Sequence, residues 1–547
     1  MVFLGFLSIV FDLVGLALLY AATLNILNPD FLSDWLSEVD LFSDMFSDKP
    51  LHSLLLTAIL VVIFIGKNGV TFLISKLQVN SAYAMAAEVS ERQFKAFLNR
   101  KMLTQKMLQS SDYVHQLYVV PASMPDGIIL SSIQCISEII FMILAILIVT
   151  VVKPSLLLLL VLTILPITFL LLYLSRKKLV DYGNQVNKAI PRMMSSVNDS
   201  VHGFTDIRLH HKEEFFKNRF LHWRNSLFKS RRKAYLIHSA VPARIMESAA
   251  VLCLFIIALY TFMFNDTENM TSLLAMFAAL AFRVLPSINR IIGSFNTFHA
   301  ASFILDILSR VEIIEKSTKY NGKFSFNKQL ELKNISLHLE GTGDVLSDLN
   351  LKVEKGKMIG IKGASGEGKT SLLNVILCLY QPNKGEILVD GKNVETDTGN
   401  WQSILAYVEQ NSFMLDGSII ENIAFGDTEP SEDRVREALQ KVSLSTWVEG
   451  LNHGIATRIG ELGGRISAGQ QQRLAIARAL YSNAEIFIFD EATNALDQAT
   501  KEEVMQSILN LKQLGYTIIM AAHDLSTLES SDKIYELKNG KLYEETV

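Results

Sequence analysis

Long apolar runs separated by polar segments dominate the first 300 positions of the chain. These runs occupy 1–27, 52–75, 126–152, 155–174, 237–264 and 271–293. A helix needs about 20 apolar residues to cross the hydrocarbon core of a bilayer, so the pattern predicts six spans. The first run lacks a basic start and a small-residue cleavage site, which favours a spanning helix over a signal peptide. Arg283 and Arg290 interrupt the last run.

The polar segments between the runs differ in charge. Segment 28–50 contains six acidic residues and one lysine, whereas segments 76–120 and 175–236 are rich in lysine and arginine. Positively charged loops stay on the cytoplasmic side, so we expect the two basic segments there. An even number of spans then places the C-terminal part of the chain in the cytoplasm as well.

Both basic segments are long and show helical spacing of apolar residues, at 88–108 and 190–220. We expect the spans to continue beyond the membrane as helical rods that transmit motion. The alternative is a basic loop that lies on anionic lipid.

Charged residues become frequent after about position 304. Residues 330–340 and 346–363 alternate as strands do, and strands then alternate with helices to the end. The sequence therefore predicts a helical membrane domain at 1–304, a linker at 305–329 and an α/β domain at 330–547.

The overall composition agrees with this division. Half of the 547 residues are hydrophobic, the mean hydropathy is +0.28 and the net charge is −4. Such a balance indicates an integral membrane protein and no nucleic-acid partner. The three cysteines lie far apart in apolar surroundings, which is typical of small core residues.

The α/β domain begins with a strand, a glycine turn and a helix, IGIKGASGEGKTSLL at 359–373. It fits the phosphate-binding pattern G-x-x-x-x-G-K-[ST], in which backbone N–H groups converge on the phosphates of a nucleotide. Lys369 would supply a positive charge and the Thr370 hydroxyl a Mg²⁺ ligand. The predicted nucleotide contacts in this loop are Gly363, Ala364, Ser365, Gly366, Glu367, Gly368, Lys369, Thr370 and Ser371.

A second stretch, IFIFDEATNALD at 486–497, places two carboxylates after a buried strand. Asp490 can hold Mg²⁺ through water, and Glu491 can orient or deprotonate a water in line with the γ-phosphate. The alternative is a strand that ends on two solvated acids.

Three further segments occur between and after these motifs: Gln410 after ILAYVEQ, RISAGQQQRLAIARAL at 465–480, and AAHDLST with His523. The five motifs stand in the order and spacing of the ATPase domain of ABC transporters, and the domain resembles that family over its whole length. The preceding six-span region resembles the exporter membrane domain of the same superfamily.

The resemblance implies roles for residues of one chain. Gln410 would contact Mg²⁺ and the attacking water and sense the membrane domain. His523 would bind the γ-phosphate and steady Glu491. The cofactors would be ATP and Mg²⁺.

The resemblance also implies a second chain, because the family works with two membrane domains and two ATPase domains. Ser467, Gly469 and Gln470 would close on the γ-phosphate of a nucleotide held by the other copy, with 494–497 communicating across the dimer. Ser467 also suits a helix N-cap. We expect a homodimer, because Glu491 and His523 are both intact.

Several positions depart from the family pattern. Leu339 stands where an aromatic residue usually stacks on adenine. Ile466 and Ala468 replace leucine and glycine in the signature segment, and Glu409 replaces a proline. These changes leave the turnover rate and the base selectivity open.

The cargo must be read from ionisable residues in or near the spans: Asp12, Lys67, Glu138, Arg244, Glu247, Arg283 and Arg290. Such residues in a membrane domain are functional by default. Arg244 and Glu247 lie on one helical face, so an ion pair and a substrate contact remain equal alternatives. The candidate substrate residues are Arg244, Glu247, Arg283 and Arg290.

Short segments at 137–140, 241–248 and 283–308 resemble bacterial lipid-linked oligosaccharide flippases, which implies an anionic, amphipathic cargo and the bacterial inner membrane. The prediction is an ATP-driven exporter or flippase. A peptide or drug exporter is the rival, and an ATP-gated regulator without coupled transport is a further alternative.

Overall fold

The computed structural model describes residues 5, 7, 9–11, 14–15, 49–99, 109–152, 154–263, 267–309, 324–339, 341–460, 463–493 and 496–545. The chain divides into two compact units. The first combines Met1–Arg100 with Lys106–Ile314, and the second combines Lys101–Gln105 with Glu315–Val547.

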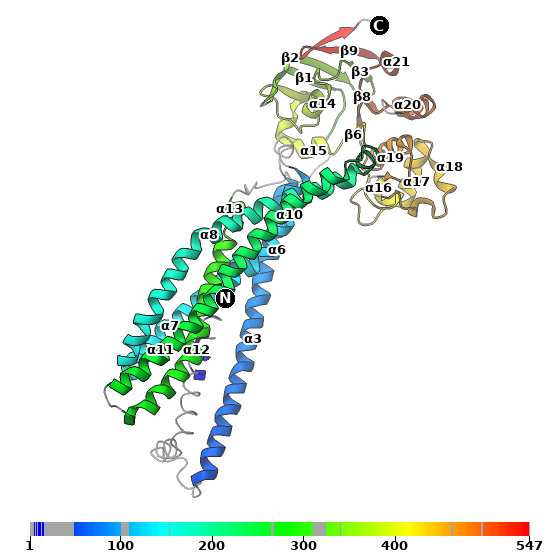
Figure 1. The fold of residues 1–547 in the computed structure, drawn as a ribbon. Coiled ribbons are helices and arrows are strands. Elements are labelled where there is room, and N and C mark those ends of the chain that lie inside the picture. The colour runs from blue at the N-terminus through cyan, green and yellow to red at the C-terminus, as the bar shows by residue number, and fades with distance from the viewer. Residues whose placement is uncertain are drawn as a thin grey trace. The chain divides into compact units, whose positions relative to one another are not determined.

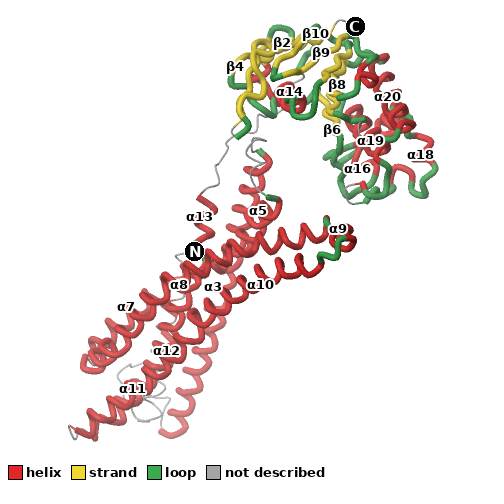
Figure 2. The backbone as a smooth tube through the Cα atoms, turned by 45° about the horizontal axis from the view of Figure 1, so that its top comes forward, coloured by secondary structure: helices red, strands yellow, loops and turns green. Residues whose placement is uncertain are grey.

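The first unit consists of long helices (Figure 1), and Figure 2 shows no strand among its described residues. Its main helices are α3 (Lys49–Leu98), α5 (Ser110–Val114), α6 (Val120–Met124), α7 (Ser131–Val152), α8 (Pro154–His202), α9 (Phe204–Leu209), α10 (Glu213–Tyr235), α11 (Val241–Met263), α12 (Thr267–Ala300) and α13 (Phe303–Ser309). Three π-helical segments join some of them: η2 (His115–Val119), η3 (Pro125–Leu130) and η4 (Leu236–Ala240).

Two helices are much longer than a bilayer requires. α3 has 50 residues and α8 has 49, which corresponds to about 75 Å each at 1.5 Å per residue. The predicted helix is confirmed for 88–98, which belong to α3, and 101–108 lie outside the described residues. The second predicted rod, 190–220, is wrong as one helix. It breaks at Gly203 and at His211 (φ 52°), and α10 then packs back along α8.

Three helical stretches among the described residues are long and apolar enough to span a membrane: Val61–Leu98, Ser110–Leu147 and Glu213–Ile256. The bent pair Val284–Ala300 and Phe303–Ser309 makes a fourth when counted as one span. The predicted spans at 155–174 and 271–293 lie within α8 and α12. Most of the predicted span 1–27, including Asp12, lies outside the described residues.

Each π-helical segment has a proline inside it or two residues after it. Pro125 begins η3, Pro121 follows η2, and Pro242 follows η4. Proline has no N–H to donate and its ring clashes with the carbonyl four residues earlier, so the regular helical ladder is disturbed there. Wide turns of this kind occur often at functional sites.

The helices α8, α11 and α12 share a core of Ile164, Met246, Cys253, Ile288 and Ile292. A polar bridge crosses the same packing. The Ser175 hydroxyl donates to Oδ1 of the fully buried Asn296 at 2.8 Å, and Asn296 Nδ2 donates to the Ile237 carbonyl of η4 at 3.3 Å. At Gly183, α8 approaches α12 so closely that a Cβ would lie 2.1 Å from the Ala300 carbonyl oxygen.

The second unit contains two sheets. The first has the order β2-β1-β4-β5 and is antiparallel: β1 (Gln329–Leu339), β2 (Gly343–Glu354), β4 (Lys384–Val389) and β5 (Lys392–Asn393). The second has the order β10-β9-β3-β8-β7-β6: β3 (Met358–Lys362), β6 (Leu405–Glu409), β7 (Ile486–Asp490), β8 (Thr517–Ala522), β9 (Lys533–Lys538) and β10 (Lys541–Glu545). In this sheet only β10 pairs antiparallel among the described strands.

Helices surround the mainly parallel sheet. They are α14 (Lys369–Ile376), α15 (Thr398–Gln402), α16 (Ile419–Ile423), α17 (Glu432–Lys441), α18 (Ser445–Glu449), α19 (Ala468–Tyr481), α20 (Gln498–Gln513) and α21 (Leu525–Leu528), with 3₁₀ turns η5 (Val394–Asp397) and η6 (Gly454–Ala456). The strand predicted at 346–363 is two strands, β2 and β3, which a turn at Gly356 (φ 74°) separates.

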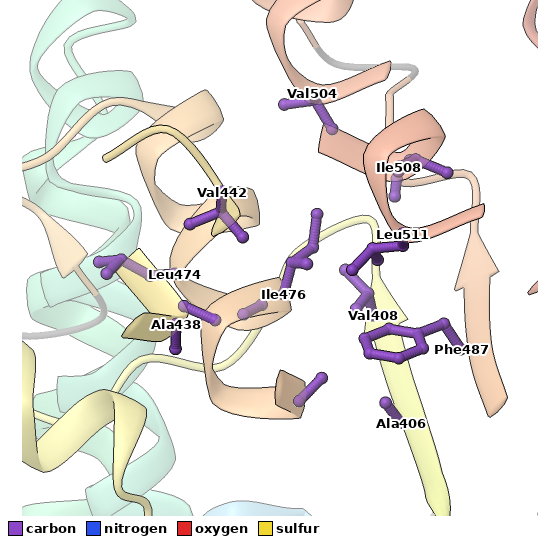
Figure 3. Packing of buried hydrophobic residues seen from close by; sticks show 14 of the residues in the cluster. Ala406, Val408, Ala438, Val442, Leu474, Ile476, Phe487, Val504, Ile508 and Leu511 are labelled. Atoms are coloured by element: carbon purple, nitrogen blue, oxygen red, sulfur yellow. The ribbon is translucent and has the colours of Figure 1, made fainter. Parts of the chain in front are cut away.

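One apolar cluster joins the sheet to the helices that follow β6. Figure 3 shows Val408 and Phe487 from the strands beside Ile508 and Leu511 of α20, with Ile476 of α19 between them and the other helices. All five side chains are essentially inaccessible to solvent. The cluster holds α19 and α20 against the sheet, and the N-terminal ends of both helices carry residues of the predicted site.

Candidate functional site

The candidate site lies where the parallel strands of the second sheet end. In a parallel sheet the carboxyl ends of all strands meet at one edge. Because β3, β8, β7 and β6 are neighbours, the residues that follow them meet in that order. Lys362 of β3 pairs with Ala522 of β8, Asp490 of β7 with Ala521, and Glu409 of β6 with Asp490.

The glycine loop between β3 and α14 has the conformation that its sequence predicts. Gly366 has φ 87° and Gly368 has φ 99°, a region that disfavours other residues, and α14 begins at Lys369. A Cβ on Gly368 would also lie only 3.0 Å from the Val345 side chain. The backbone of this loop therefore depends on glycine at 366 and 368.

Lys369 lies inside the loop. Its side chain is 4% exposed, and Nζ donates to the Gly363 carbonyl at 2.8 Å and to the Ala364 carbonyl at 3.1 Å. Nζ also lies 3.1 Å from Glu491 Oε1 and 3.2 Å from His523 Nε2. The ammonium group is thus held at a fixed position at the edge of the sheet.

Glu491 and His523 complete this cluster. His523 follows β8 and its Nε2 lies 2.9 Å from Glu491 Oε1. Glu491 follows β7 with φ 51°, an uncommon value for a residue other than glycine, and its N–H donates to the Ala521 carbonyl at 2.9 Å. The strained turn directs the carboxylate toward Lys369 and His523, so three residues far apart in sequence meet.

Asp490 stands next to this cluster and is 8% exposed. Its Oδ2 accepts a hydrogen bond from the Tyr407 hydroxyl at 3.1 Å, whereas Oδ1 is buried and has no hydrogen-bond partner among the described residues. Burial, followed by the charge of Asp490, raises the pKa of Tyr407, so the phenol stays a donor. A buried carboxylate oxygen without a partner fits a Mg²⁺ ion or its water shell. The Thr370 hydroxyl, at the start of α14, and Gln410, after β6, are the other protein groups predicted for this ion.

The backbone of Gln410 is fixed by a residue that the sequence analysis did not identify. Gln472 of α19 donates through Nε2 to the carbonyls of Glu409 at 2.8 Å and Gln410 at 2.6 Å. The Gln410 side chain is exposed at the end of β6. Tyr407 and Gln472 both lie in segments that the sequence analysis quoted, and the side-chain alternation of β6 could have placed Tyr407 on the Asp490 face.

The signature segment is a capped helix start. The Ser467 hydroxyl accepts from the Gln470 N–H at 3.2 Å, and Gln470 Oε1 accepts from the Ser467 N–H at 2.9 Å. The predicted N-cap is therefore confirmed. Ser467 and Ala468 are exposed, and no hydrogen bond between the described residues ties Ser467 to Lys369. Gly469 is buried, and a Cβ there would lie 2.0 Å from Thr500 Cγ2 of α20.

Other predicted positions have plain surroundings. Leu339 ends β1 and packs on the core with no aromatic plane to offer. Asp497 caps α20 through the Thr500 N–H at 3.0 Å, and Asn494 lies outside the described residues. Residues 363–368 form the loop between β3 and α14, and residues 369–371 are the first turn of α14.

The candidate substrate residues are mostly paired. Arg244 Nη1 lies 2.8 Å from Glu247 Oε2, and both side chains are exposed. Arg290 Nε lies 3.0 Å from Oε1 of Glu138, whose side chain is 9% exposed. The side chain of Arg283 lies outside the described set.

Comparison with known proteins agrees with this geometry. Residues 2–285 match the family model described as ABC transporter transmembrane region, and residues 346–494 match the model described as ABC transporter. A solved structure described as a bacterial Atm1-family ABC exporter with ATP bound superposes with a TM-score of 0.75 at 18% identity, over 98% of this chain and 94% of that one. The fold is therefore that of an ABC exporter.

Two curated relatives are similar over part of their length. The "Heterocyst differentiation ATP-binding protein HepA" of a Nostoc strain is 32% identical over 63% of this chain and 57% of its own length. The "ATP-dependent lipid A-core flippase" of Saccharophagus degradans is 29% identical over 68% of this chain and 64% of its own length. In both, the match spans less than two thirds of the relative.

With a matching transmembrane region over half of its length, an ATP-binding domain after it and an exporter fold throughout, the chain belongs to the ABC transporter family and is an integral membrane protein of the half-transporter type.

Proposed function

We propose that this protein is an ATP-driven exporter that moves an amphipathic, lipid-linked substrate across the membrane. The observation that carries the proposal is the cluster of Lys369, Glu491 and His523 at the edge of the sheet, beside the buried Asp490. A domain that only bound ATP as a regulator would not need a carboxylate positioned next to a histidine at the end of β7.

The residues of the cluster divide the work of phosphoryl transfer to water. The loop 363–371 and Lys369 would bind the β- and γ-phosphates, and Glu491 would orient a water and accept its proton. As the water oxygen bonds to the γ-phosphorus, the bond from that phosphorus to the β–γ bridging oxygen breaks and ADP leaves. His523 holds Glu491 and donates to the γ-phosphate. Bound Mg²⁺, held by Asp490, Thr370 and Gln410, would neutralise charge on the phosphate oxygens.

Lys369 Nζ and Glu491 Oε1 form an ion pair at 3.1 Å. A γ-phosphate would attract the ammonium group away from the carboxylate, because a phosphate carries more negative charge. Glu491 would then be released to bind water only after ATP has been bound. The ion pair between Lys369 and Glu491 would therefore make the release of the general base depend on the binding of ATP.

Hydrolysis in this proposal needs a second copy of the chain. Ser467 is exposed and Gln470 is half-buried at the start of α19, a helix end whose N–H groups favour an anion. They have no described contact with the Lys369 cluster of their own chain. Ser467, Gly469 and Gln470 of one copy would close over the nucleotide of the other, and the nucleotide-binding domains would face the cytoplasm of a bacterial inner membrane.

The substrate class rests on the relative named as a lipid A-core flippase and on the polar residues of the membrane unit. Because Arg244 and Arg290 both contact carboxylates, they add little net positive charge. Among the candidate substrate residues, we therefore assign the anionic linkage of a lipid-linked oligosaccharide to Arg283, whose side chain lies outside the described set. A peptide or drug exporter remains the rival proposal.

Replacing Glu491 with glutamine tests the catalytic assignment. Purified Glu491→Gln should bind ATP but hydrolyse it at less than about 1% of the normal rate, since the general base is lost. Glu485→Gln is the matched control, because Glu485 directly precedes the same strand and its carboxylate pairs with Lys355 at the surface. Normal hydrolysis by Glu491→Gln would contradict the proposal, as would no lipid movement by the normal reconstituted protein.

A further inference from the structure

A polar cavity lies inside the membrane unit. It has a volume of about 560 Å³, within the range of small-molecule sites. Its walls come from η3 and the start of α7, from η4 and the start of α11, and from α12. Two of the three walls are thus π-helical segments, the wide turns that prolines impose on this fold.

Six of the thirteen residues that line the cavity are serine, threonine, asparagine or glutamine. The cavity is lined by Ser131, Gln134, Ser239, Asn289, Ser294 and Thr297, among others. Polar side chains in the interior of a membrane domain are costly and usually mark a substrate path. The cavity therefore has the composition of a binding site rather than of a packing defect, which would be apolar.

Some of these side chains are held in place and still have hydrogen-bond donors or acceptors available for a ligand. The Ser294 hydroxyl donates to Gln134 Oε1 at 3.0 Å, which fixes the amide and leaves its two N–H donors for a ligand. Asn289 Oδ1 is buried and has no hydrogen-bond partner among the described residues. A buried acceptor without a partner costs free energy unless a ligand or water satisfies it.

The charged groups of the cavity nearly cancel. Asp126 accepts from the Tyr83 hydroxyl at 3.2 Å, and Arg290 is bound to the buried Glu138. His238 contacts Thr297 through Nε2 at 3.5 Å. An anionic group in the cavity would meet the Asp126 carboxylate, and the Arg290 side chain of the lining is already paired with Glu138, so the electrostatics favour an uncharged ligand.

We infer that the cavity between η3, η4 and α12 binds an uncharged, hydroxyl-rich group, a sugar, through Gln134, Asn289 and Ser294. Sugar hydroxyls both donate and accept, which matches amide and hydroxyl partners on the wall. Leu130, Pro242 and Ala243 supply apolar contact for the faces of the ring. This inference rests on the proposed function, since it names the head group of the amphipathic substrate.

Binding is measured without ATP, by calorimetry on the full-length protein in detergent. The probes are a polyprenyl diphosphate that carries a neutral oligosaccharide, the free oligosaccharide, and the polyprenyl diphosphate alone. Asn289→Leu and Ser294→Ala should each weaken binding of the first probe about three- to tenfold, the value of one lost hydrogen bond, and leave the third unchanged. If the substitutions weaken binding of the free oligosaccharide equally, the protein recognises the sugar by itself. If they weaken binding only when the lipid is attached, the protein recognises the sugar as part of the lipid-linked molecule.

Thr150→Val is the matched control, because the Thr150 hydroxyl is exposed on α7 and, among the described residues, bonds only the Ile146 carbonyl of its own helix. Ser294→Ala removes a single oxygen and guards against misfolding of the leucine variant. Unchanged affinity in both variants, equal loss for the sugar-free lipid, or no binding of either sugar probe would overturn the inference. Failure of the Glu491→Gln test would leave this result intact, because no hydrolysis is involved.

Discussion

Gly469 has a structural role within one chain that can be separated from its proposed role at the nucleotide. A Cβ at this position would lie 2.0 Å from Cγ2 of Thr500, where real contacts are close to 4 Å. Thr500 cannot turn away freely, because its hydroxyl donates to Asp497 Oδ2 at 2.7 Å. Gly469→Ala must therefore either push α19 from α20 or break that hydrogen bond.

Either route costs about 1–3 kcal/mol, the range for an overpacked core and for a lost bond to a carboxylate. The unfolding temperature of the nucleotide-binding domain should fall by about 2–12 °C at the scale of a domain of this size. The measurement is thermal unfolding of the full chain in detergent without nucleotide, followed by fluorescence.

Thr500→Ser removes only the methyl group and keeps the hydroxyl for Asp497. Gly469→Ala with Thr500→Ser should therefore unfold within about 2 °C of Thr500→Ser alone, since the two positions are coupled through that methyl group. ATP hydrolysis should stay low in the rescued variant if Gly469 also approaches phosphate. An unaltered unfolding temperature in Gly469→Ala, or no rescue by Thr500→Ser, would refute the steric reasoning.

Three further predictions concern single contacts. Tyr407→Phe removes the hydrogen bond that orients Asp490, so the Mg²⁺ concentration for half-maximal hydrolysis should rise about tenfold. The affinity for Mg²⁺-free ATP should stay the same. An unchanged Mg²⁺ dependence would show that Tyr407 does not position Asp490 for the ion. Burial raises the pKa of Cys378 to about 12, so the thiol should react with iodoacetamide at pH 8 far more slowly in the folded protein than after denaturation, as peptide mapping would show; equal rates would contradict this. Arg290→Ala leaves the Glu138 carboxylate buried without its cation and should destabilise the membrane unit by about 1–3 kcal/mol in thermal unfolding. Adding Glu138→Gln should recover most of the lost stability. Destabilisation that persists in the double variant would disprove the pairing argument.

The phosphate-binding loop and the capped start of α19 were predictable because each depends on residues that are adjacent in sequence. The glycines at 366 and 368, the helix start at Lys369 and the cap at Ser467 each follow from a few adjacent residues. The contact between Glu491 and His523 depends on the strand order, and before the structure only the family resemblance implied it.

Other contacts were beyond sequence reasoning. The hydrogen bond between Tyr407 and Asp490 joins positions 83 residues apart, and that between Gln472 and Gln410 joins positions 62 apart. In the membrane unit, apolar periodicity located the helices but not the π-helical segments, whose wide turns change which side chains share a face. The pairing of Arg290 with Glu138 depends on this packing, which is why the sequence alone did not reveal it.

The central claim is that each ATP is hydrolysed in a site built from two copies of the chain. Lys369→Ala disables binding, and Ser467→Asp keeps a good N-cap but places a negative charge where the partner's phosphate would bind. Each variant alone should form dimers with no working site, whereas a mixed dimer keeps one site whose Lys369 and Ser467 are both intact.

The most direct measurement is therefore the ATPase rate of the two variants, purified separately and after co-expression. If the sites act independently, half of the co-expressed dimers are mixed and each retains one site of two, so about a quarter of the normal rate should return. No recovery above the separate variants, or full activity of Ser467→Asp alone, would contradict a site shared between two chains.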